Sequence, residues 1–255
     1  MKRPQQKAAF LAPVLASLIA CGATMESTAG NDGRLTARPK PGGTAAPAPG
    51  EHRLGLDARR DAVLFVPSNA AAHDVPLLLL LHGAGGAGER ILGRLRDAAE
   101  ETGVAILAPD SRDATWDAIH MGFGADVGFI DRALARVFET VSVDPNRIAI
   151  GGFSDGASYA LSLGLVNGDL FQHIVAFSPG FFVGGRRVGK PRVFVSHGTS
   201  DEVLPIEQTG LQVVSGLRKQ GYDVAFHEFD GRHEVPPAIA KEGLTWVKNF
   251  SPSPR

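Results

Sequence analysis

Cysteine is almost absent from this chain of 255 residues, and charge of neither sign is in excess. The single cysteine, Cys21, excludes an intrachain disulfide and any zinc site built from paired cysteines. The 26 basic and 27 acidic residues leave a formal net charge of −1, without a long basic run. An electrostatic surface for nucleic acid or for a membrane is therefore not indicated. No two histidines have the spacing of metal ligands on a helix, so we do not expect a metal site.

Long hydrophobic runs are lacking too. The apolar stretch at residues 8–20 is too short for a membrane-spanning helix, and basic residues precede it, as in an export signal. It ends in Leu18-Ile19-Ala20-Cys21, which resembles the lipobox of bacterial lipoproteins, where the cysteine becomes lipidated. We predict that residues 1–20 are a signal peptide and that Cys21 carries a lipid anchor to a membrane of the bacterial cell envelope. The alternative is an ordinary secretory signal and a periplasmic or secreted product.

The next segment lacks apolar periodicity. Residues 22–50 are rich in Gly, Ala, Thr and Pro, and four prolines fall between positions 39 and 49. Proline there disfavours a helix or a central strand. We therefore predict that residues 21–50 form a lipidated cysteine with a flexible tether, which would span about 30 Å. The catalytic domain is expected at 51–251, followed by a short tail at 252–255.

The globular part alternates between two hydrophobic patterns. Short apolar runs bounded by turn residues predict buried strands, and apolar residues spaced three and four apart predict amphipathic helices. The predicted strands are 62–66, 76–81, 104–108, 147–150, 174–177, 192–195 and 224–229, and the predicted helices are 88–101, 126–141, 155–166, 206–219 and 235–249. This alternation predicts an α/β fold with a mostly parallel central sheet flanked by helices. Ligands bind at the carboxyl ends of such strands.

One of those strand ends carries Gly152-Phe153-Ser154-Asp155-Gly156. A strand precedes it and a helix follows, which is the setting of a nucleophile elbow. Small residues at both ends let the chain reverse sharply, so that the serine hydroxyl projects from the turn. We predict that Ser154 is a catalytic nucleophile. The alternative is a structural Gly-Ser turn.

A serine hydroxyl needs a base near neutral pH, and the base needs an orienting acid. Asp201 follows the strand at 192–195, and His233 follows the strand at 224–229. This chain order, serine then acid then histidine, is the order of α/β-hydrolase triads. We predict Asp201 as the acid, with Glu202 as its rival, and His233 as the base, with a solvated loop histidine as the alternative.

The loop 82–86, His82-Gly83-Ala84-Gly85-Gly86, is predicted to supply one backbone donor of an oxyanion hole. The second donor would be the N–H of Asp155. Ala84 is the first choice within the loop, with Gly83 next to it as a substrate-binding residue. A phosphate-binding loop is the alternative, but the Lys-Ser/Thr ending and the glycine spacing of such loops are missing.

The remaining candidates have simpler interpretations. His82 and His197 each end a strand next to glycine, so we expect them to order the backbone rather than to act as the base. Trp116 is a candidate substrate contact. It could line an acyl or aryl pocket together with Phe123, Phe181 and Phe182, and ordinary core packing is the alternative.

These motifs resemble those of the phospholipase/carboxylesterase family. The matching segments are Leu81 to Gly86, Gly151 to Gly156, His197-Gly198 with Asp201, and Gly231 to Pro237. Asp126 to Asp131 also resembles the secreted polyhydroxybutyrate depolymerase and feruloyl esterase group. The resemblance covers about residues 60–250. It implies an α/β-hydrolase fold that cleaves small carboxylic esters through an acyl-enzyme without a cofactor, with Ser154, Asp201 and His233 as triad and Ala84 and Asp155 as oxyanion donors.

Two features set this chain apart within that group. The family commonly has Gln after the nucleophile, and Asp155 stands here instead, so we expect anionic substrates to be disfavoured. Only Gly180 to Pro191 separates two core strands, which leaves no room for a large lid domain. The competing hypotheses are a catalytically inactive surface lipoprotein that acts as a binding module, and a serine peptidase. Hydrolysis of an aryl ester would exclude the first, and hydrolysis of peptide amides would favour the second.

Overall fold

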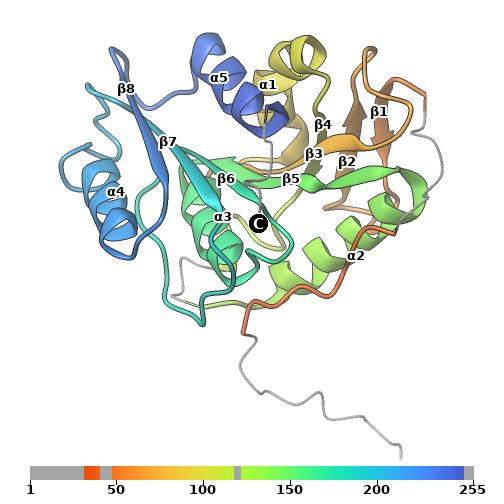
Figure 1. The fold of residues 1–255 in the computed structure, drawn as a ribbon, viewed down its shortest axis with the longest axis horizontal. Helices are drawn as coiled ribbons and strands as arrows, with labels where there is room; N and C mark the ends of the chain where they lie inside the picture. Colours follow the sequence, from red (N-terminus) through yellow and green to blue (C-terminus); the bar gives the residue numbers. More distant parts are fainter. Residues whose placement is uncertain (1–31, 41–47, 118–121, 250–255) are drawn as a thin grey trace, which may run out of the picture.

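A computed structural model describes residues 32–40, 48–117 and 122–249. An eight-stranded sheet with the order β1-β2-β4-β3-β5-β6-β7-β8 forms the centre (Figure 1). The strands are β1 Gly50–Arg53, β2 Ala62–Val66, β3 Val75–Leu81, β4 Ala105–Pro109, β5 Val143–Phe153, β6 His173–Phe177, β7 Arg192–Gly198 and β8 Val224–Phe229. The helices are α1 Gly88–Thr102, α2 Ala125–Thr140, α3 Asp155–Val166, α4 Gly210–Lys219 and α5 Pro237–Lys248.

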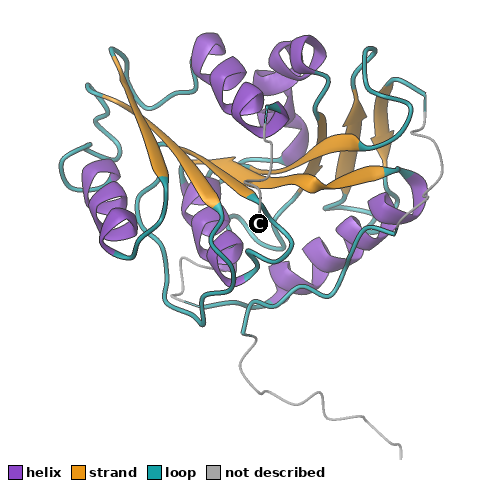
Figure 2. Cartoon of the chain, viewed as in Figure 1, coloured by secondary structure: helices purple, strands orange, loops and turns teal. Residues whose placement is uncertain are grey.

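Helices cover both faces of the sheet, as Figure 2 shows. The buried side chains of α1 and α5 pack against one face, and those of α2, α3 and α4 pack against the other. Strand β3 lies in the middle and is buried along its whole length, which explains its run of five leucines. The predicted mostly parallel α/β sheet is therefore confirmed. The antiparallel pairs are β1 with β2 and β2 with β4, at one side of the sheet.

The parallel register brings the predicted strand ends to one edge of the sheet. Leu81 at the end of β3 pairs with Gly152 of β5, and Phe153 pairs with Phe177 of β6. Gly198 at the end of β7 pairs with Phe229 of β8. The loops that carry the candidate functional residues therefore leave the sheet on the same side.

The element boundaries differ from the prediction in two informative places. Strand β1 was not predicted, because its four residues alternate between half-buried and exposed and carry little apolar signal. Helix α4 begins at Gly210 rather than near 206. The carbonyl of Pro205 accepts the N–H groups of Gln208 and Thr209, so the chain first makes a turn. Residues 178–191 contain neither helix nor strand, in agreement with the expected short connection.

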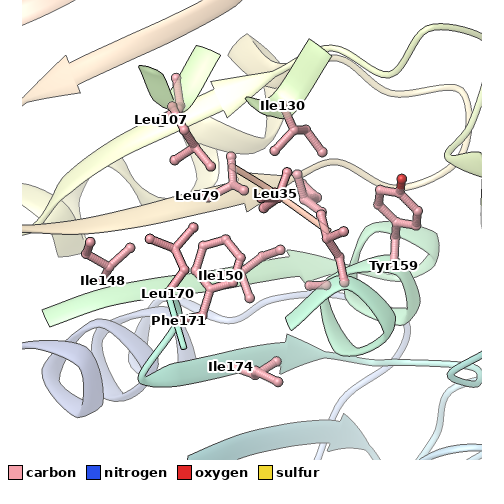
Figure 3. Packing of buried hydrophobic residues seen from close by; sticks show 14 of the residues in the cluster. Leu35, Leu79, Leu107, Ile130, Ile148, Ile150, Tyr159, Leu170, Phe171 and Ile174 are labelled. Atoms are coloured by element: carbon pink, nitrogen blue, oxygen red, sulfur yellow. The ribbon is translucent and has the colours of Figure 1, made fainter. Parts of the chain in front are cut away.

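Part of the predicted flexible tether is docked on the domain, which corrects the prediction for residues 32–40. Leu35 is 2% exposed, and Figure 3 shows it among the core side chains around Leu79 and Ile130. The side chain of Asn167 accepts the N–H of Leu35 at 2.9 Å and donates to the carbonyl of Gly33 at 2.7 Å. The backbone of this segment is held by hydrogen bonds to side chains that are distant in sequence. Such contacts leave no periodic pattern, so the composition of the segment did not predict them.

Charged contacts complete this docked segment, residues 33–38, which we call the N-terminal strap. Asp131 on α2 accepts the backbone N–H groups of Thr36 and Ala37, each at 2.8 Å. The guanidinium of Arg34 forms two parallel hydrogen bonds of 2.8 Å with the carboxylate of Asp169. The strap is therefore an integral part of the folded domain.

Within the ranges that the structure describes, no helix is long and apolar enough to cross a membrane. The predicted signal peptide at 1–20 and the predicted lipid site at Cys21 lie outside these ranges.

Candidate active site

Ser154 occupies a strained turn between β5 and α3. Its backbone has φ +57° and ψ −121°, a conformation that non-glycine residues rarely adopt. The flanking glycines make this turn possible, because a Cβ at Gly152 would come within 2.4 Å of the Gly156 backbone. A Cβ at Gly156 would come within 2.3 Å of the carbonyl oxygen of Leu81. The turn therefore has the geometry expected of a nucleophile elbow.

Three side chains from three loops form one chain of hydrogen bonds. The Oγ of Ser154 lies 2.9 Å from Nε2 of His233. The Nδ1–H of His233 donates to Oδ2 of Asp201 at 2.7 Å. The side chain of Asp201 is fully buried, whereas that of His233 is 15% exposed, so a reactant can approach from the histidine side. The fold thus brings together the serine, the acid and the histidine that the sequence singled out.

Both oxygens of the Asp201 carboxylate accept hydrogen bonds. Its Oδ1 accepts the N–H groups of Val203 and Leu204 at 2.9 and 2.8 Å. Burial by itself would raise the pKa of Asp201, but the hydrogen bonds from Leu204 and His233 outweigh it and keep the pKa below its ordinary value. Glu202, the rival acid, is exposed and pairs with Arg232, so it does not reach His233.

His82 holds the loop 82–86 in place, as expected. The backbone N–H of Ser111 donates to its Nε2 at 3.0 Å, so Nε2 is unprotonated, and Nδ1–H donates to the carbonyl of Gly83 at 2.8 Å. Burial lowers the pKa of His82, which keeps the ring in this neutral tautomer. The second ordering histidine, His197, lies against Asp201, a contact that the sequence did not reveal.

The candidate backbone donors of the oxyanion hole are those N–H groups near Ser154 that have no other acceptor. The N–H of Gly85 donates to Ala114 at 2.7 Å, and that of Gly86 donates to Gly83 at 3.0 Å. Gly83 and Ala84 remain as the loop's candidate donors. Asp155 is the first residue of α3, so its N–H has no acceptor within the helix. A Cβ at Gly83 would lie 3.3 Å from the Cβ of Ser154, which places the loop directly against the candidate nucleophile.

The loop after β4 braces this arrangement. Thr115 donates its hydroxyl to Oδ2 of Asp155 at 2.5 Å. Asp126, in the first turn of α2, accepts the backbone N–H groups of Arg112 and Asp117 at 2.6 and 2.9 Å. Burial raises the pKa of Asp126 to about 6. These contacts fix residues 112–117 next to the start of α3. Neither Thr115 nor the buried position of Asp126 was predicted, because both depend on contacts distant in sequence.

Trp116 is packed in the core, the alternative that the sequence left open, and does not face an open pocket. It is 1% exposed, and its indole N–H donates to the carbonyl of His82 at 2.7 Å. Its ring stacks on that of Tyr159, with 5.4 Å between the ring centres. Trp116 therefore packs against the loop 82–86 and supports it. The other apolar pocket candidates, Phe123, Phe181 and Phe182, are partly buried and pack against the core.

A cavity of about 120 Å³ lies against the loop 82–86 and against Phe153, the residue before Ser154, and its lining includes none of the three hydrogen-bonded side chains. A larger cavity of about 560 Å³ lies between β7, β8 and α5 and contains none of the three hydrogen-bonded side chains. His120, in the loop before α2, lies outside the described residues. In the part of the chain that the structure describes, no cluster of three or more His, Cys, Asp or Glu side chains could hold a metal ion.

Comparison with known proteins gives a consistent result. Residues 127–250 match the family described as Phospholipase/Carboxylesterase. A curated relative, "Putative esterase NocK" from Nocardia uniformis subsp. tsuyamanensis, is 28% identical over 143 residues, which make up 52% of this chain and 42% of that protein. The chain therefore spans less than half the length of that relative.

Several solved structures share the fold. FphF, a fluorophosphonate-binding serine hydrolase of Staphylococcus aureus, is 16% identical with a TM-score of 0.64, over 80% of this chain and 100% of its own. The Bacillus cereus carboxylesterase is 20% identical with a TM-score of 0.58, over 75% of this chain and 94% of its own. At these identities the likeness shows the shared α/β fold alone.

Proposed function

We propose that this chain, which belongs to the α/β-hydrolase superfamily and matches its phospholipase/carboxylesterase family, is a serine esterase of small carboxylic esters. The observation that carries this proposal is the hydrogen-bond chain from Asp201 through His233 to Ser154. In acyl-transfer enzymes a buried carboxylate orients a histidine, and the histidine acts as the base that activates the serine hydroxyl.

The geometry supports a two-step reaction. The Oγ of Ser154 attacks the ester carbonyl carbon while its proton passes to Nε2 of His233. The N–H groups of Asp155 and of Ala84 or Gly83 stabilise the negative charge on the carbonyl oxygen. His233 then returns the proton to the leaving alcohol, and an acyl-enzyme remains on Ser154. A water molecule, deprotonated by His233, attacks the acyl-enzyme, the acid leaves, and His233 returns the proton to the Oγ of Ser154. The chemistry needs no cofactor.

The substrates are proposed to be small or short-chain esters. Residues 178–191 form a short loop, which provides no helical cover for a long acyl chain. Enzymes of long-chain lipids commonly shield their apolar groove with a mobile cover. The cavity against the loop 82–86 and Phe153 is small, about 120 Å³. An aryl ester of the feruloyl type remains a second substrate class, favoured by the sequence resemblance rather than by Trp116.

The test is hydrolysis of p-nitrophenyl esters with acyl chains of two to sixteen carbons, with and without detergent micelles. We expect the highest kcat/KM for the short chains and no activation by micelles. Ser154→Ala should lower kcat by roughly 10³-fold or more without loss of folding. An inactive wild-type protein would favour the binding-module hypothesis. Cleavage of peptide amides with comparable kcat/KM would favour the peptidase hypothesis.

The cellular location is a separate part of the proposal. We propose that Cys21 is lipidated after removal of residues 1–20 and that the domain stays at the bacterial cell envelope. The strap begins at Gly33, so the link between Cys21 and the folded domain has at most about 12 residues and a reach of about 40 Å. Cys21→Ser should release the protein from membranes. Mass spectrometry of mature membrane-bound protein with an unmodified Cys21 would contradict the lipid anchor.

A further inference from the structure

The cavity of about 120 Å³ between the loop 82–86, Phe153 and α1 is lined by two kinds of residue. On one side lie Gly83 and Phe153, which are in contact with or adjacent to Ser154. On the other side lie Arg90 and Arg94, both from α1. Because Gly83 and Phe153 are direct neighbours of Ser154, the cavity lies within reach of a group attached to an ester bound at Ser154.

The two arginines lack the partners that other arginines nearby have. Arg90 and Arg94 are one helical turn apart, so their side chains lie on the same face of α1, where like charges destabilise a helix. Within the described residues, no carboxylate lies within 4.0 Å of either guanidinium. By contrast, Arg96 on the same helix is paired with Glu51. The cavity thus contains two cationic side chains that remain available to a bound anion.

Arg94 is also linked to the hydrogen-bonded site through an aromatic ring. Its guanidinium carbon lies 5.4 Å from the ring centre of Phe153. The ring of Phe153 in turn lies 4.7 Å from that of His233. Stacking on Phe153 restricts where the Arg94 head can lie, so the cation stays close to the site.

We propose that this cavity is a subsite for an anionic group, a carboxylate or a phosphate, carried by the ester substrate. The proposal rests on the proposed esterase function and names its substrate class. Guanidinium groups bind carboxylates and phosphates through paired hydrogen bonds. Asp155 alone suggested that anions would be disfavoured, but its carboxylate is bonded to Thr115 and pairs with neither arginine. The two positive charges of Arg90 and Arg94 outweigh the one negative charge of Asp155, so we now expect anionic substrates to be favoured.

The test compares esters that differ only in the charge of one end. Monoethyl succinate carries a carboxylate, ethyl succinamate carries the neutral amide of the same shape, and ethyl 3-phosphonopropanoate carries a phosphonate. Ethanol release gives kcat/KM for each ester with the wild type, with the double variant Arg90→Gln/Arg94→Gln, and with Arg96→Gln as a control on the same helix.

We expect the wild type to prefer one of the anionic esters over the amide by about tenfold, the effect of one charged hydrogen bond. The double variant should lose that preference, and Arg96→Gln should keep it. The preferred anion tells whether the natural group is a carboxylate or a phosphate. Equal or better hydrolysis of the amide by the wild type, or a preference that survives in the double variant, would overturn the subsite. Failure to hydrolyse any ester, p-nitrophenyl acetate included, would instead overturn the esterase function.

Discussion

The Nε2 of His197 lies 3.2 Å from Oδ2 of Asp201, the same oxygen that accepts the hydrogen bond from His233. The ring of His197 is fully buried, and its Nε2–H donates to the carbonyl of Leu204 at 2.7 Å. Burial lowers the pKa of His197, so the ring is neutral and adds a donor without a positive charge. His197 is therefore a positioning residue for the candidate acid.

Replacing His197 should alter the pH dependence of the reaction. In His197→Phe the Asp201 carboxylate loses a nearby donor and holds a proton on the His233 ring more strongly. We expect kcat/KM to fall about tenfold and its acid limb to move to higher pH, by roughly half a unit. His197→Gln, which can restore a donor, should recover part of both effects. An acid limb that stays in place in both variants would reduce His197 to a packing role.

Gly83 tests the closeness of the loop to the nucleophile. In Gly83→Ala the new methyl group would lie 3.3 Å from the Cβ of Ser154 and 3.4 Å from the carbonyl of Phe153. We expect kcat to fall about tenfold, because a misplaced oxyanion donor has an effect of this order or larger. Thermal melting should change little. Gly93→Ala on the exposed side of α1, where a Cβ meets nothing within 4 Å, should keep full activity and gain up to about 1 kcal/mol of stability.

The strap should contribute measurably to the stability of the domain. Leu35→Ala leaves a cavity in the core, so we expect a loss of about 2–3 kcal/mol in the free energy of unfolding by urea. Asp169→Asn weakens the half-exposed pairs with Arg34 and Arg38, for a loss of about 1 kcal/mol. A strap that only rests on the surface would leave the unfolding midpoint of Leu35→Ala at the wild-type value.

Acid should destabilise the fold through His173. This residue is fully buried, and burial lowers its pKa from 6.5 to about 4. A folded-state pKa below the unfolded value means that its stability contribution is present above pH 6.5 and is lost as the pH falls towards 4. The loss is at most about 3 kcal/mol, from 1.36 kcal/mol per pKa unit. His173→Phe should flatten the urea-unfolding free energy between pH 7 and 5. An unchanged slope in this variant would show that another group controls the acid response.

The sequence by itself determined the order of the strands and helices after β1 and the identity of the three hydrogen-bonded residues Ser154, Asp201 and His233. Runs such as the five leucines of β3 report burial on both faces, which is a local pattern. The elbow is local as well, because Gly152 and Gly156 stand within two residues of Ser154 and their absent side chains remove the clash. Asp201 and His233 could be found because parallel strands deliver their loops to one edge of the sheet.

Only the tertiary structure decided which residues surround Ser154, Asp201 and His233. Trp116 follows β4 and His197 lies at the end of β7, as functional residues often do, yet one supports a loop and the other contacts Asp201. Arg90 and Arg94 carry no motif, and they matter only because α1 packs next to the loop 82–86. Leu35 lies in a segment of polar composition and is buried through contacts more than 90 residues away in the chain. Hydrophobic periodicity and motifs report neighbours in sequence, whereas each of these positions depends on neighbours that only the folded chain brings together.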